Sequence, residues 1–476
     1  MLKVLFISSE VSPYAKSGGL GDVAGSLPKA LKDMGVDVRV VFPKYKNIKP
    51  QYTETAKYIG SYKVKLDWRE QSASVYELDS EVTTYIIEND YYFTNRDGYY
   101  GYGDDGERFT FFSRAALDLL NIIDFIPDVI HCNDWQSAPV CLYVKDYYKR
   151  YVALENVKTL YTIHNLQYQG ICGKDCLNLM GLNEGYFTQD KMEFNGMISF
   201  MKTGIVYADA VSTVSKTYAN EIQTSQYGYG LDGVLRQRKN DLFGIVNGID
   251  YSQDDPATNK SIYVNFDANN LSGKKENKRL LQEELGLPVK DVPMISIISR
   301  LVDQKGINLV IDAINELVSK DIQFVVLGTG DGRYEHILKE FECRYPDKIS
   351  ANIMFDGNLA KKIYASSDLF LMPSLFEPCG LGQLFAMSYG TVPIVRTTGG
   401  LVDTVTEYNR ETKVGNGFAF KDYDANGMLW AINQAISVYN SEDWETVVKN
   451  AINTRFSWEI SAKEYIDLYE KLKNEK

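Results

Sequence analysis

The 476-residue sequence has no long uncharged apolar run and no excess of positive charge. No window is long enough to cross a membrane as a helix. The apolar stretch at residues 1–8 is too short for the hydrophobic region of a signal peptide and is soon followed by Glu10. We therefore expect a cytoplasmic protein. The net charge of −12 argues against nucleic acid or an anionic membrane as the main partner, since either requires a basic face.

Clustered metal ligands are also scarce. The six cysteines are scattered, and Cys172 and Cys176 have a wide spacing with no second pair, which favours an ordinary loop over a zinc site. No Asp-x-Asp motif follows any strand predicted below, where it could hold a divalent ion. We expect reduced thiols, no metal and no cofactor.

Strand-length apolar runs alternate with helical periodicity along the chain, which is typical of parallel sheets flanked by helices. The length predicts two large domains, and 45% apolar residues suffice for a core in each. Seven strands, expected to complete a first sheet, are predicted at residues 4–8, 37–42, 83–87, 129–132, 159–163, 210–213 and 243–246. A second series is predicted at residues 294–299, 324–327, 352–355, 369–372 and 392–395.

A polar, irregular segment at residues 250–260 separates the two series and predicts a domain boundary near residue 250. An amphipathic helix at residues 458–472 could return to either domain. Ligands of doubly wound sheets bind outside the carboxyl ends of the strands. We therefore expect two domains that face each other across a ligand crevice, each supplying part of one site.

Lys16 and three glycines, Gly18, Gly19 and Gly21, lie between the first strand and an amphipathic helix. A helix that begins after such a loop presents unpaired amides and a positive dipole end, which suit an anion such as a nucleotide diphosphate. Taken alone, glycines in this place more often make only a tight connection between strand and helix.

Residues 19–24 also match the G-x-G-x-x-A fingerprint of dinucleotide-binding enzymes. Three features disfavour a nicotinamide-dependent dehydrogenase. A ten-residue loop precedes the glycines, a lysine stands in front of them, and no acidic residue follows the second strand to bind a ribose.

The loop after the strand at 294–299 carries two cations. Arg300 can donate to two phosphoryl oxygens at once and Lys305 adds a point charge, so the loop predicts a diphosphate site. A solvated basic turn explains this stretch equally well when it is considered alone.

The loop after the strand at 369–372 carries a carboxylate beside exposed amides. Glu377 can accept hydrogen bonds from sugar hydroxyls, and the amides of Cys379, Gly380 and Leu381 can face an anion at the start of the next helix. This is the most specific motif in the chain.

Polar residues also end three strands of the first half. His164 and Asn247 are both expected to point into the crevice, although a lone histidine is more often structural. Asp134 lies in the segment 131–136, for which a buried polar turn around Trp135 is an equally good explanation.

With these motifs in place, the chain resembles bacterial glycogen and starch synthases, which are retaining glucosyltransferases of the two-domain GT-B type. The resemblance covers essentially the whole length, and the order and spacing of the motifs are highly specific. The matching stretches are residues 9–11, 16–22, 162–170, 247–250, 299–306, 377–381 and 396–401.

The resemblance implies an α/β fold of two Rossmann-like domains with parallel sheets, which face each other across a deep cleft. The N-terminal, acceptor-side domain would span residues 1–248 and be joined by the C-terminal helix at 457–476. The nucleotide-sugar-binding domain would span residues 249–456.

The resemblance also implies roles for individual residues. Cations would hold the diphosphate, and Glu377, His164 and Asn247 would hold the glucose. The residues expected to be catalytic are Lys16, His164, Arg300, Lys305 and Glu377. Those expected to bind the donor are Gly18, Gly19, Asn247, Phe355, Cys379, Gly380 and Leu381. Those expected near the site or the acceptor are Glu10, Asp22, Tyr100, Asp134 and Lys278.

The chain departs from the family pattern at three positions. Ser17 stands where threonine is usual, Phe355 where many members have a tyrosine near the nucleobase, and Gln136 where many have a histidine. None of these departures removes a charged group, so they bear on base preference more than on activity.

The implied reaction is transfer of glucose from ADP-glucose to the non-reducing 4-hydroxyl of an α-1,4-glucan, with retention and without a metal. The partners would be ADP-glucose or ADP and a glycogen, starch or maltooligosaccharide acceptor. We expect same-face attack, with the departing phosphate taking the proton and Glu377 positioning the sugar; the alternative makes Glu377 a covalent nucleophile. Two further hypotheses are a transferase with a small acceptor, of the sucrose- or trehalose-synthase type, and a non-catalytic glucan- or nucleotide-binding protein.

Overall fold

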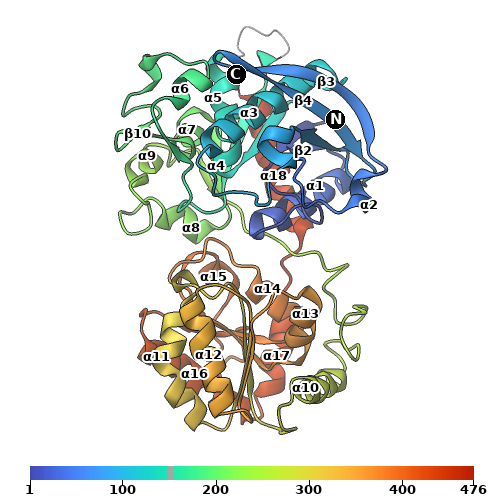
Figure 1. Cartoon of the computed structure of the whole chain (residues 1–476). Coiled ribbons are helices and arrows are strands. Elements are labelled where there is room, and N and C mark those ends of the chain that lie inside the picture. The colour runs from blue at the N-terminus through green and yellow to red at the C-terminus, as the bar shows by residue number, and fades with distance from the viewer. Residues whose placement is uncertain (148–153, 476) are drawn as a thin grey trace. The chain divides into compact units, whose positions relative to one another are not determined.

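The computed structural model describes residues 1–147 and 154–475. It divides into two compact units, which are considered separately (Figure 1). Unit 1 comprises Met1–Val246 together with Trp458–Lys476, and unit 2 comprises Asn247–Ser457. The domain boundaries that the resemblance implied differ from these by two residues at the first crossing and by one at the second.

Unit 1 is built on a nine-stranded sheet in the order β12-β11-β7-β6-β1-β2-β5-β4-β3. Seven of its strands are parallel and overlap the seven predicted ones, although β12 begins one residue earlier and ends two residues earlier than the strand predicted at 243–246. Their bounds are β1 Lys3–Ile7, β2 Asp37–Pro43, β5 Thr84–Glu88, β6 Val129–Asn133, β7 Lys158–Ile163, β11 Ala210–Thr213 and β12 Leu242–Gly244. In chain order, the parallel strands run 3-2-1-4-5-6-7 across the sheet, which is the doubly wound arrangement.

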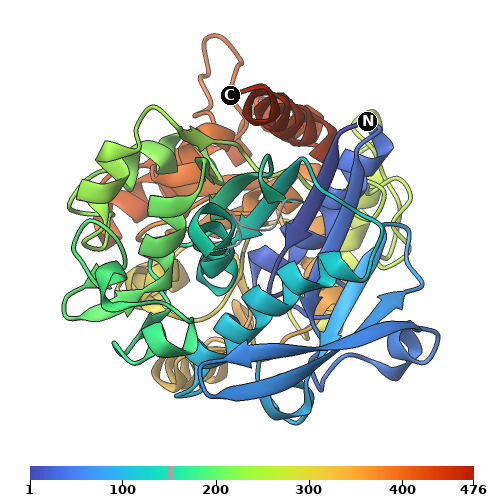
Figure 2. The ribbon, with the colours of Figure 1, turned by 90° about the horizontal axis from the view of Figure 1, so that it is seen from above.

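The prediction that seven strands complete this sheet is wrong. A long antiparallel hairpin, β3 (Lys57–Leu66) and β4 (Arg69–Leu78), extends it beyond β5 (Figure 2). Only one face of the hairpin is buried, and Val64 and Val75 lie on that face. Lysines lie on the other, exposed face of β3. A strand half exposed in this way is not a continuous apolar run.

Helices cover both faces of the unit 1 sheet. The C-terminal helix α18 (Trp458–Asn474) packs beside α1 (Gly19–Asp33), as the resemblance implied for the fold, and Tyr469 OH on α18 lies 2.7 Å from His131 Nδ1 on β6. Among the described residues, unit 1 also contains α2 Pro50–Thr53, η1 Asp90–Thr94, α3 Asp105–Asp118, η2 Leu119–Asn121, α4 Asp134–Ser137, α5 Pro139–Leu142, η3 Tyr143–Tyr147, β8 Ile171–Cys172, α6 Cys176–Leu179, η6 Glu184–Tyr186, β9 Glu193–Phe194, β10 Met197–Ser199, α7 Phe200–Tyr207, α8 Lys216–Glu221 and α9 Asp232–Gln237.

Unit 2 has a six-stranded parallel sheet in the order β15-β14-β13-β16-β17-β18, which in chain order is 3-2-1-4-5-6. Its strands are β13 Met294–Ile298, β14 Gln323–Leu327, β15 Ile349–Asn352, β16 Leu369–Met372, β17 Val392–Arg396 and β18 Phe418–Phe420. The surrounding helices are α10 Ser272–Glu284, η7 Asp303–Lys305, α11 Ile307–Ser319, α12 Gly332–Arg344, α13 Gly357–Ser366, α14 Gly382–Ser388, α15 Gly399–Thr404, α16 Ala425–Tyr439 and α17 Trp444–Asn453.

One predicted strand of unit 2 is wrong in position. The strand expected at residues 352–355 is β15, which pairs with β14 from Ile349 to Asn352 and ends there. The apolar residues that follow lead into α13, whose N-cap Asp356 accepts hydrogen bonds from Asn358 N and Leu359 N at 2.8 and 3.0 Å. Phe355 therefore lies in a loop and is 89% exposed.

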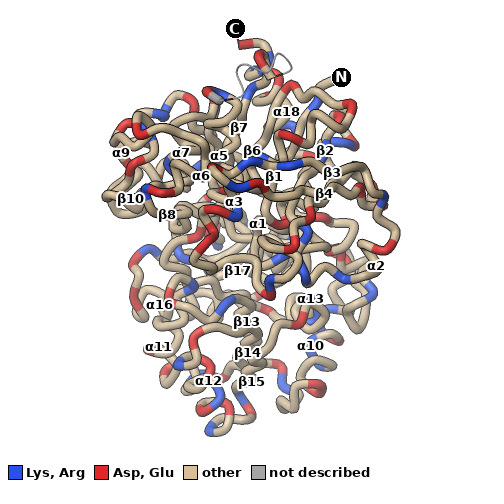
Figure 3. The backbone as a smooth tube through the Cα atoms, turned by 45° about the horizontal axis from the view of Figure 1, so that its top comes forward, with Lys and Arg blue, Asp and Glu red and all other residues tan. Residues whose placement is uncertain are grey.

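Acidic and basic residues are intermixed over both units (Figure 3). Within the described parts of the chain, no helix has the length and apolar character needed to cross a membrane.

Candidate functional site

The sheet order places a topological switch point in each unit, where a ligand crevice is expected outside the carboxyl ends of the strands. In unit 1 the switch lies between β1 and β6, and in unit 2 between β13 and β16. Glu10 and Lys16 follow β1, and Asp134 follows β6. Arg300 and Lys305 follow β13, and Glu377 follows β16, so most predicted residues flank one of these two points.

Glu10 fixes the beginning of the glycine loop in unit 1. Its buried carboxylate accepts hydrogen bonds from Ser17 N, from Ser17 Oγ at 2.6 Å and from Gly18 N at 3.3 Å. Two amides of the predicted phosphate loop are therefore already bonded to a carboxylate of the protein. Ser17 stands where the family pattern has threonine, and its hydroxyl donates to Glu10.

Tyr100 completes this arrangement. Its hydroxyl donates to Glu10 Oε1 at 2.6 Å and lies 2.8 Å from Ser9 Oγ, which must then be the donor to Tyr100. Burial raises the pKa of Tyr100 well above its ordinary value, so the phenol stays protonated. Glu10 and Tyr100, both predicted near the site, are thus in direct contact.

Arg108 holds the loop that carries Tyr100, and the sequence analysis missed it. The fully buried guanidinium donates to Tyr92 O at 2.8 Å and Tyr99 O at 3.3 Å and pairs with Asp105. Asp105 in turn accepts from Gly101 N at 2.8 Å. Because Arg108 lies inside α3 and not at a strand end, no sequence signal connected it with the site.

Lys16 and Asp22 form an ion pair across the glycine loop, with Nζ 2.7 Å from Oδ1. Burial raises the pKa of Asp22, and the lysine charge opposes this rise. Gly18, the N-cap of α1, has extended backbone, and a Cβ built on it would meet no atom within 4 Å. The protein itself leaves the space above Gly18 open.

Asp134 and His164 lie side by side at the ends of β6 and β7. Asp134 Oδ1 accepts from His164 N at 2.7 Å and Asn165 N at 3.4 Å. Burial raises the pKa of Asp134 to about 7, although these two amides oppose the rise. Burial also lowers the pKa of His164 to about 3, so its imidazole is neutral near pH 7.

In unit 2, Lys305 and Glu377 form a close pair. Lys305 Nζ lies 2.6 Å from Glu377 Oε2, which also accepts from Ser374 Oγ at 2.9 Å. Gly306, with φ +71°, allows the two loops to approach, since a Cβ there would lie 2.0 Å from Pro373 O. Arg300 is exposed, and its guanidinium lies 3.4 Å from Gln304 Oε1.

The loop that carries Glu377 rests on the loop after β17. Arg396 donates to Leu375 O at 2.6 Å and Ser374 O at 3.4 Å, and Gly400 N donates to Glu377 O at 3.1 Å. Sequence reasoning matched residues 396–401 to the family but gave Arg396 no role. A cation directly at the end of a predicted strand was the available signal.

Asn247 and Cys379 also meet in unit 2. Burial raises the pKa of the Cys379 thiol to about 12. The backbone amide of Asn247, which is hydrogen-bonded to the sulfur, opposes this rise. The buried Asn247 Oδ1 has no hydrogen-bond partner among the described residues. Such an atom normally has a partner, so a ligand hydroxyl would satisfy it.

The amides expected at the start of a helix need a correction in detail. Helix α14 begins only at Gly382, with Leu381 as its N-cap, so Cys379 and Gly380 belong to the preceding loop. Gly380 has φ +76°, and the Gln383 amide donates to Cys379 O and Gly380 O at 3.1 and 3.0 Å. The loop is therefore shaped by Gln383.

Lys278 is not brought together with the other predicted residues of unit 2. Its Nζ donates to Asp368 Oδ2 and Val292 O, each at 2.6 Å, and Asp368 Oδ2 also accepts from Met294 N at 2.8 Å. These groups lie where β13 and β16 begin, at the opposite edge of the sheet from Arg300 and Glu377. This position favours a structural role for Lys278.

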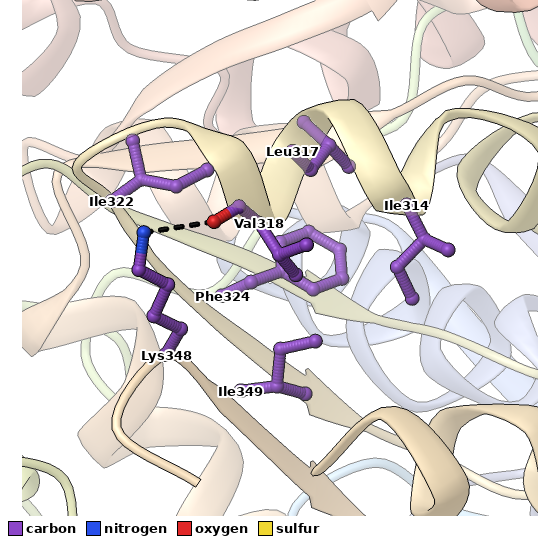
Figure 4. Close-up of a pocket in the computed structure, with 7 residues that line it drawn as sticks. All are labelled: Ile314, Leu317, Val318, Ile322, Phe324, Lys348 and Ile349. Atoms are coloured by element: carbon purple, nitrogen blue, oxygen red, sulfur yellow. Dashed lines mark hydrogen bonds between the residues drawn. The ribbon is translucent and has the colours of Figure 1, made fainter. Parts of the chain in front are cut away.

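A shallow apolar hollow also lies at that edge of unit 2, between the end of α11 and the beginnings of β14 and β15 (Figure 4). Lys348 closes one side by donating to Val318 O at 2.8 Å. The hollow is distant from the carboxyl ends of these strands and forms no part of the candidate site. Its lining residues are Ile314, Leu317, Val318, Ile322, Phe324, Lys348 and Ile349.

Across residues 1–147 and 154–475, no group of three or more histidines, cysteines or acidic residues could hold a metal ion. Asp422 and Asp424 form an Asp-x-Asp motif after β18, a strand that the sequence analysis did not predict. Asp424 caps α16 by accepting from Gly427 N at 2.7 Å. The Cys172 and Cys176 thiols are hydrogen-bonded to each other.

The family described as starch synthase catalytic domain matches residues 3–237, and the family described as glycosyl transferases group 1 matches residues 279–454. The glycogen synthase of Clostridium novyi (strain NT) is 51% identical over 473 residues, which is 98% of each chain. The glycogen synthase of Thermotoga maritima is 51% identical over 480 residues, which is 99% of each chain.

Two solved structures also match over essentially the whole chain. The catalytic domain of starch synthase IV from Arabidopsis thaliana, bound to ADP and acarbose, is 34% identical and matches with a TM-score of 0.90 over 100% of both chains. The sucrose-phosphate synthase of Thermosynechococcus elongatus matches with a TM-score of 0.63 over 99% of both chains but is only 18% identical. The second likeness concerns the fold alone.

Proposed function

Because the chain belongs to the glycogen and starch synthase family of glycosyltransferases, we propose that it transfers glucose from ADP-glucose to the non-reducing 4-hydroxyl of an α-1,4-glucan with retention. The ADP and acarbose in the Arabidopsis starch synthase structure support a nucleotide donor and a glucan acceptor. We keep the cytoplasm as the proposed location.

One observation carries the proposal: Arg300 and the Lys305–Glu377–Ser374 group flank the switch point of unit 2. A departing diphosphate gains negative charge as the bond to the sugar breaks, and fixed cations stabilise that charge. Arg300 can donate two parallel hydrogen bonds to phosphoryl oxygens, and Lys305 supplies a point charge. The proposal also assigns Lys16, on the glycine loop of unit 1, to the diphosphate.

The sugar would be held by hydrogen-bond acceptors and donors among the residues described above. Glu377 and the unpartnered Asn247 Oδ1 can accept from glucose hydroxyls. The neutral His164 ring is suited to hydrogen bonding with a hydroxyl and carries no charge that would repel a developing oxocarbenium ion. We propose that Glu377 positions the sugar, and that the departing phosphate accepts the proton of the attacking hydroxyl on the same face.

The proposed reaction uses the cations Lys16, Arg300 and Lys305 in place of a metal ion. Purified protein assayed with and without a chelator tests this point directly. Equal rates support the proposal, whereas loss of rate that added Mg²⁺ restores would contradict it.

A panel of nucleotide sugars with a maltooligosaccharide primer, followed by linkage and anomer analysis of the product, tests the reaction itself. We expect ADP release and chain extension through α-1,4 bonds. A single disaccharide product would favour the small-acceptor alternative, and binding of glucan or nucleotide without ADP release would favour a non-catalytic protein.

A further inference from the structure

Both lysines that the proposed function assigns to the diphosphate are already paired with a carboxylate of their own unit. Lys16 Nζ lies 2.7 Å from Asp22 Oδ1, and Lys305 Nζ lies 2.6 Å from Glu377 Oε2. Arg300 has no carboxylate partner among the described residues and contacts the neutral Gln304 side chain. Each carboxylate therefore offsets the positive charge that its lysine presents to a ligand.

The two carboxylates retain capacity for further hydrogen bonds. Glu377 accepts both of its hydrogen bonds from the described residues at Oε2, which leaves Oε1 available. Asp22 contacts Lys16 through Oδ1 alone, and its side chain is 26% exposed. An ionised carboxylate accepts only, so its natural ligand partner is a hydroxyl.

We propose that Asp22 and Glu377 are specificity-determining counter-charges, which make the protein bind a sugar-bearing nucleoside diphosphate in preference to the bare nucleoside diphosphate. This inference rests on the proposed function and deepens it. It concerns how the protein distinguishes its donor from the nucleotide product that shares almost every atom with it.

Charge is the first basis of the distinction. A terminal phosphate has a second pKa near 6, so at neutral pH a bare diphosphate carries almost one more negative charge than the same diphosphate esterified to a sugar. Each carboxylate beside a binding lysine repels a ligand in proportion to the charge of that ligand. Asp22 and Glu377 therefore weaken the binding of the bare nucleotide more than that of the donor.

Hydroxyl groups are the second basis. The ribose hydroxyls are common to both ligands, but only the donor also offers the hydroxyls of the transferred sugar to the carboxylate oxygens, and hydrogen bonds to charged groups are stronger than neutral ones. A carboxylate next to a lysine thus weakens the binding of the bare nucleotide. For the donor, hydrogen bonds from the transferred sugar offset part of this loss. The expected consequence for catalysis is release of the nucleotide once the sugar has left.

Asp22→Asn tests the inference because it removes one charge, keeps the side-chain shape and leaves Lys16 in place. The matched control is Asp33→Asn, which removes the same charge from the exposed last residue of the same helix, α1. Titration calorimetry at fixed ionic strength would give the dissociation constants of ADP and of ADP-glucose without acceptor. We expect the ratio of the two constants to shift by about fivefold toward ADP in Asp22→Asn and to stay unchanged in Asp33→Asn.

Glu377→Gln, measured by binding alone, provides the same test for unit 2. A merely structural role of either carboxylate would weaken both ligands together and leave the ratio unchanged, which would overturn the inference. A shift toward ADP-glucose would also overturn it. Failure of the wild-type protein to release ADP in the presence of a glucan primer would instead contradict the proposed function, which separates the two outcomes.

Discussion

His164 Nε2 lies 2.9 Å from Asn133 Oδ1, while the Asn133 amide nitrogen donates to Ile7 O at 3.0 Å. This orientation of Asn133 turns an acceptor toward the imidazole, so Nε2 must carry the proton. Because His164 is neutral near pH 7, its Nδ1 is then a hydrogen-bond acceptor. The structure thus determines the direction of any hydrogen bond that His164 makes with a ligand.

Asn133→Asp should raise the pKa of His164 from its value of about 3, because a carboxylate beside Nε2 stabilises the imidazolium. A rise of about 1–3 pH units is expected. The chain has only three histidines, so their imidazole signals can be followed by NMR and assigned with a His164→Gln variant.

Turnover of Asn133→Asp should also fall relative to wild type as the pH is lowered through the raised His164 pKa, at about pH 4–6, because an imidazolium has no acceptor at Nδ1. Asn121→Asp adds the same charge at an exposed position of unit 1 and serves as the control. An unaltered His164 titration in Asn133→Asp would show that Asn133 does not govern the protonation of the ring.

Asp134→Asn should stabilise the protein near neutral pH. Folding raises the pKa of Asp134 from 3.8 to about 7, so the folded chain keeps a proton that the unfolded chain has lost. The contribution of this carboxyl to stability is therefore fully present below about pH 3.8 and is lost as the pH rises to about 7. Integrated over that range, the loss is at most about 4 kcal/mol.

Urea unfolding of wild type and Asp134→Asn at pH 5 and pH 8 checks the sign. The free energy of unfolding of the wild type should fall relative to that of the variant between these two pH values. Asp124→Asn, at an exposed position of the same unit, should follow the wild type. A variant less stable than wild type at pH 8 would contradict the raised pKa.

Most of the parallel strands were predictable because strands buried on both faces are continuous apolar runs, but the short strand β18 (Phe418–Phe420) was not predicted. The β3–β4 hairpin was not, because Lys63 and Lys65 face solvent while Val64 and Leu66 are buried. The position of β15 was missed for the opposite reason. The last residue of β15 that pairs with β14 is Asn352, but apolar residues continue from Ile353 to Phe355. The only sequence signal that these residues lie outside the strand is Asp356, which caps α13.

The position of charged residues at strand ends was predictable, since the carboxyl ends of parallel strands share one edge of a sheet. Their pairing was not. Lys305 and Glu377 are 72 residues apart in the sequence, and Asn133 and His164 are 31 apart, so their contacts depend on how separate loops pack. Arg108 and Lys278 show the same limit, because their positions follow from helix packing and not from a local motif.

Arg300→Ala should lower turnover by about 10²–10³-fold while leaving the fold intact. The side chain is exposed and, among the described residues, is hydrogen-bonded to Gln304, so its removal leaves no buried group unsatisfied. Arg300→Lys should recover part of the rate, because a point charge remains but the two parallel hydrogen bonds do not.

Initial rates and thermal unfolding of both variants provide the measurement. Arg333→Ala, which removes an exposed arginine paired with Asp331 in the same unit, is the control and should retain full activity. A full rate in Arg300→Ala would remove this residue from the proposed mechanism.

Two glycines of the candidate site should respond in opposite ways to alanine. Gly399 has φ +47°, and a Cβ there would lie 1.9 Å from Glu377 O, so Gly399→Ala must displace the loop that carries Glu377. We expect a loss of about 2 kcal/mol or more in stability together with a loss of activity. Gly357→Ala, where a Cβ would meet no atom within 4 Å, is the matched control in unit 2 and should be neutral.

Gly18→Ala should instead leave the thermal unfolding temperature unchanged, because its backbone is extended and a Cβ would meet no atom of the protein. If the diphosphate approaches the backbone at this point, the added methyl group occupies that space, and the KM for the donor should rise while stability does not change. A donor KM equal to that of the wild type would show that the ligand does not come close to Gly18. The glycine loop would then serve only to connect β1 with α1, which is the plainer explanation that its sequence also allows.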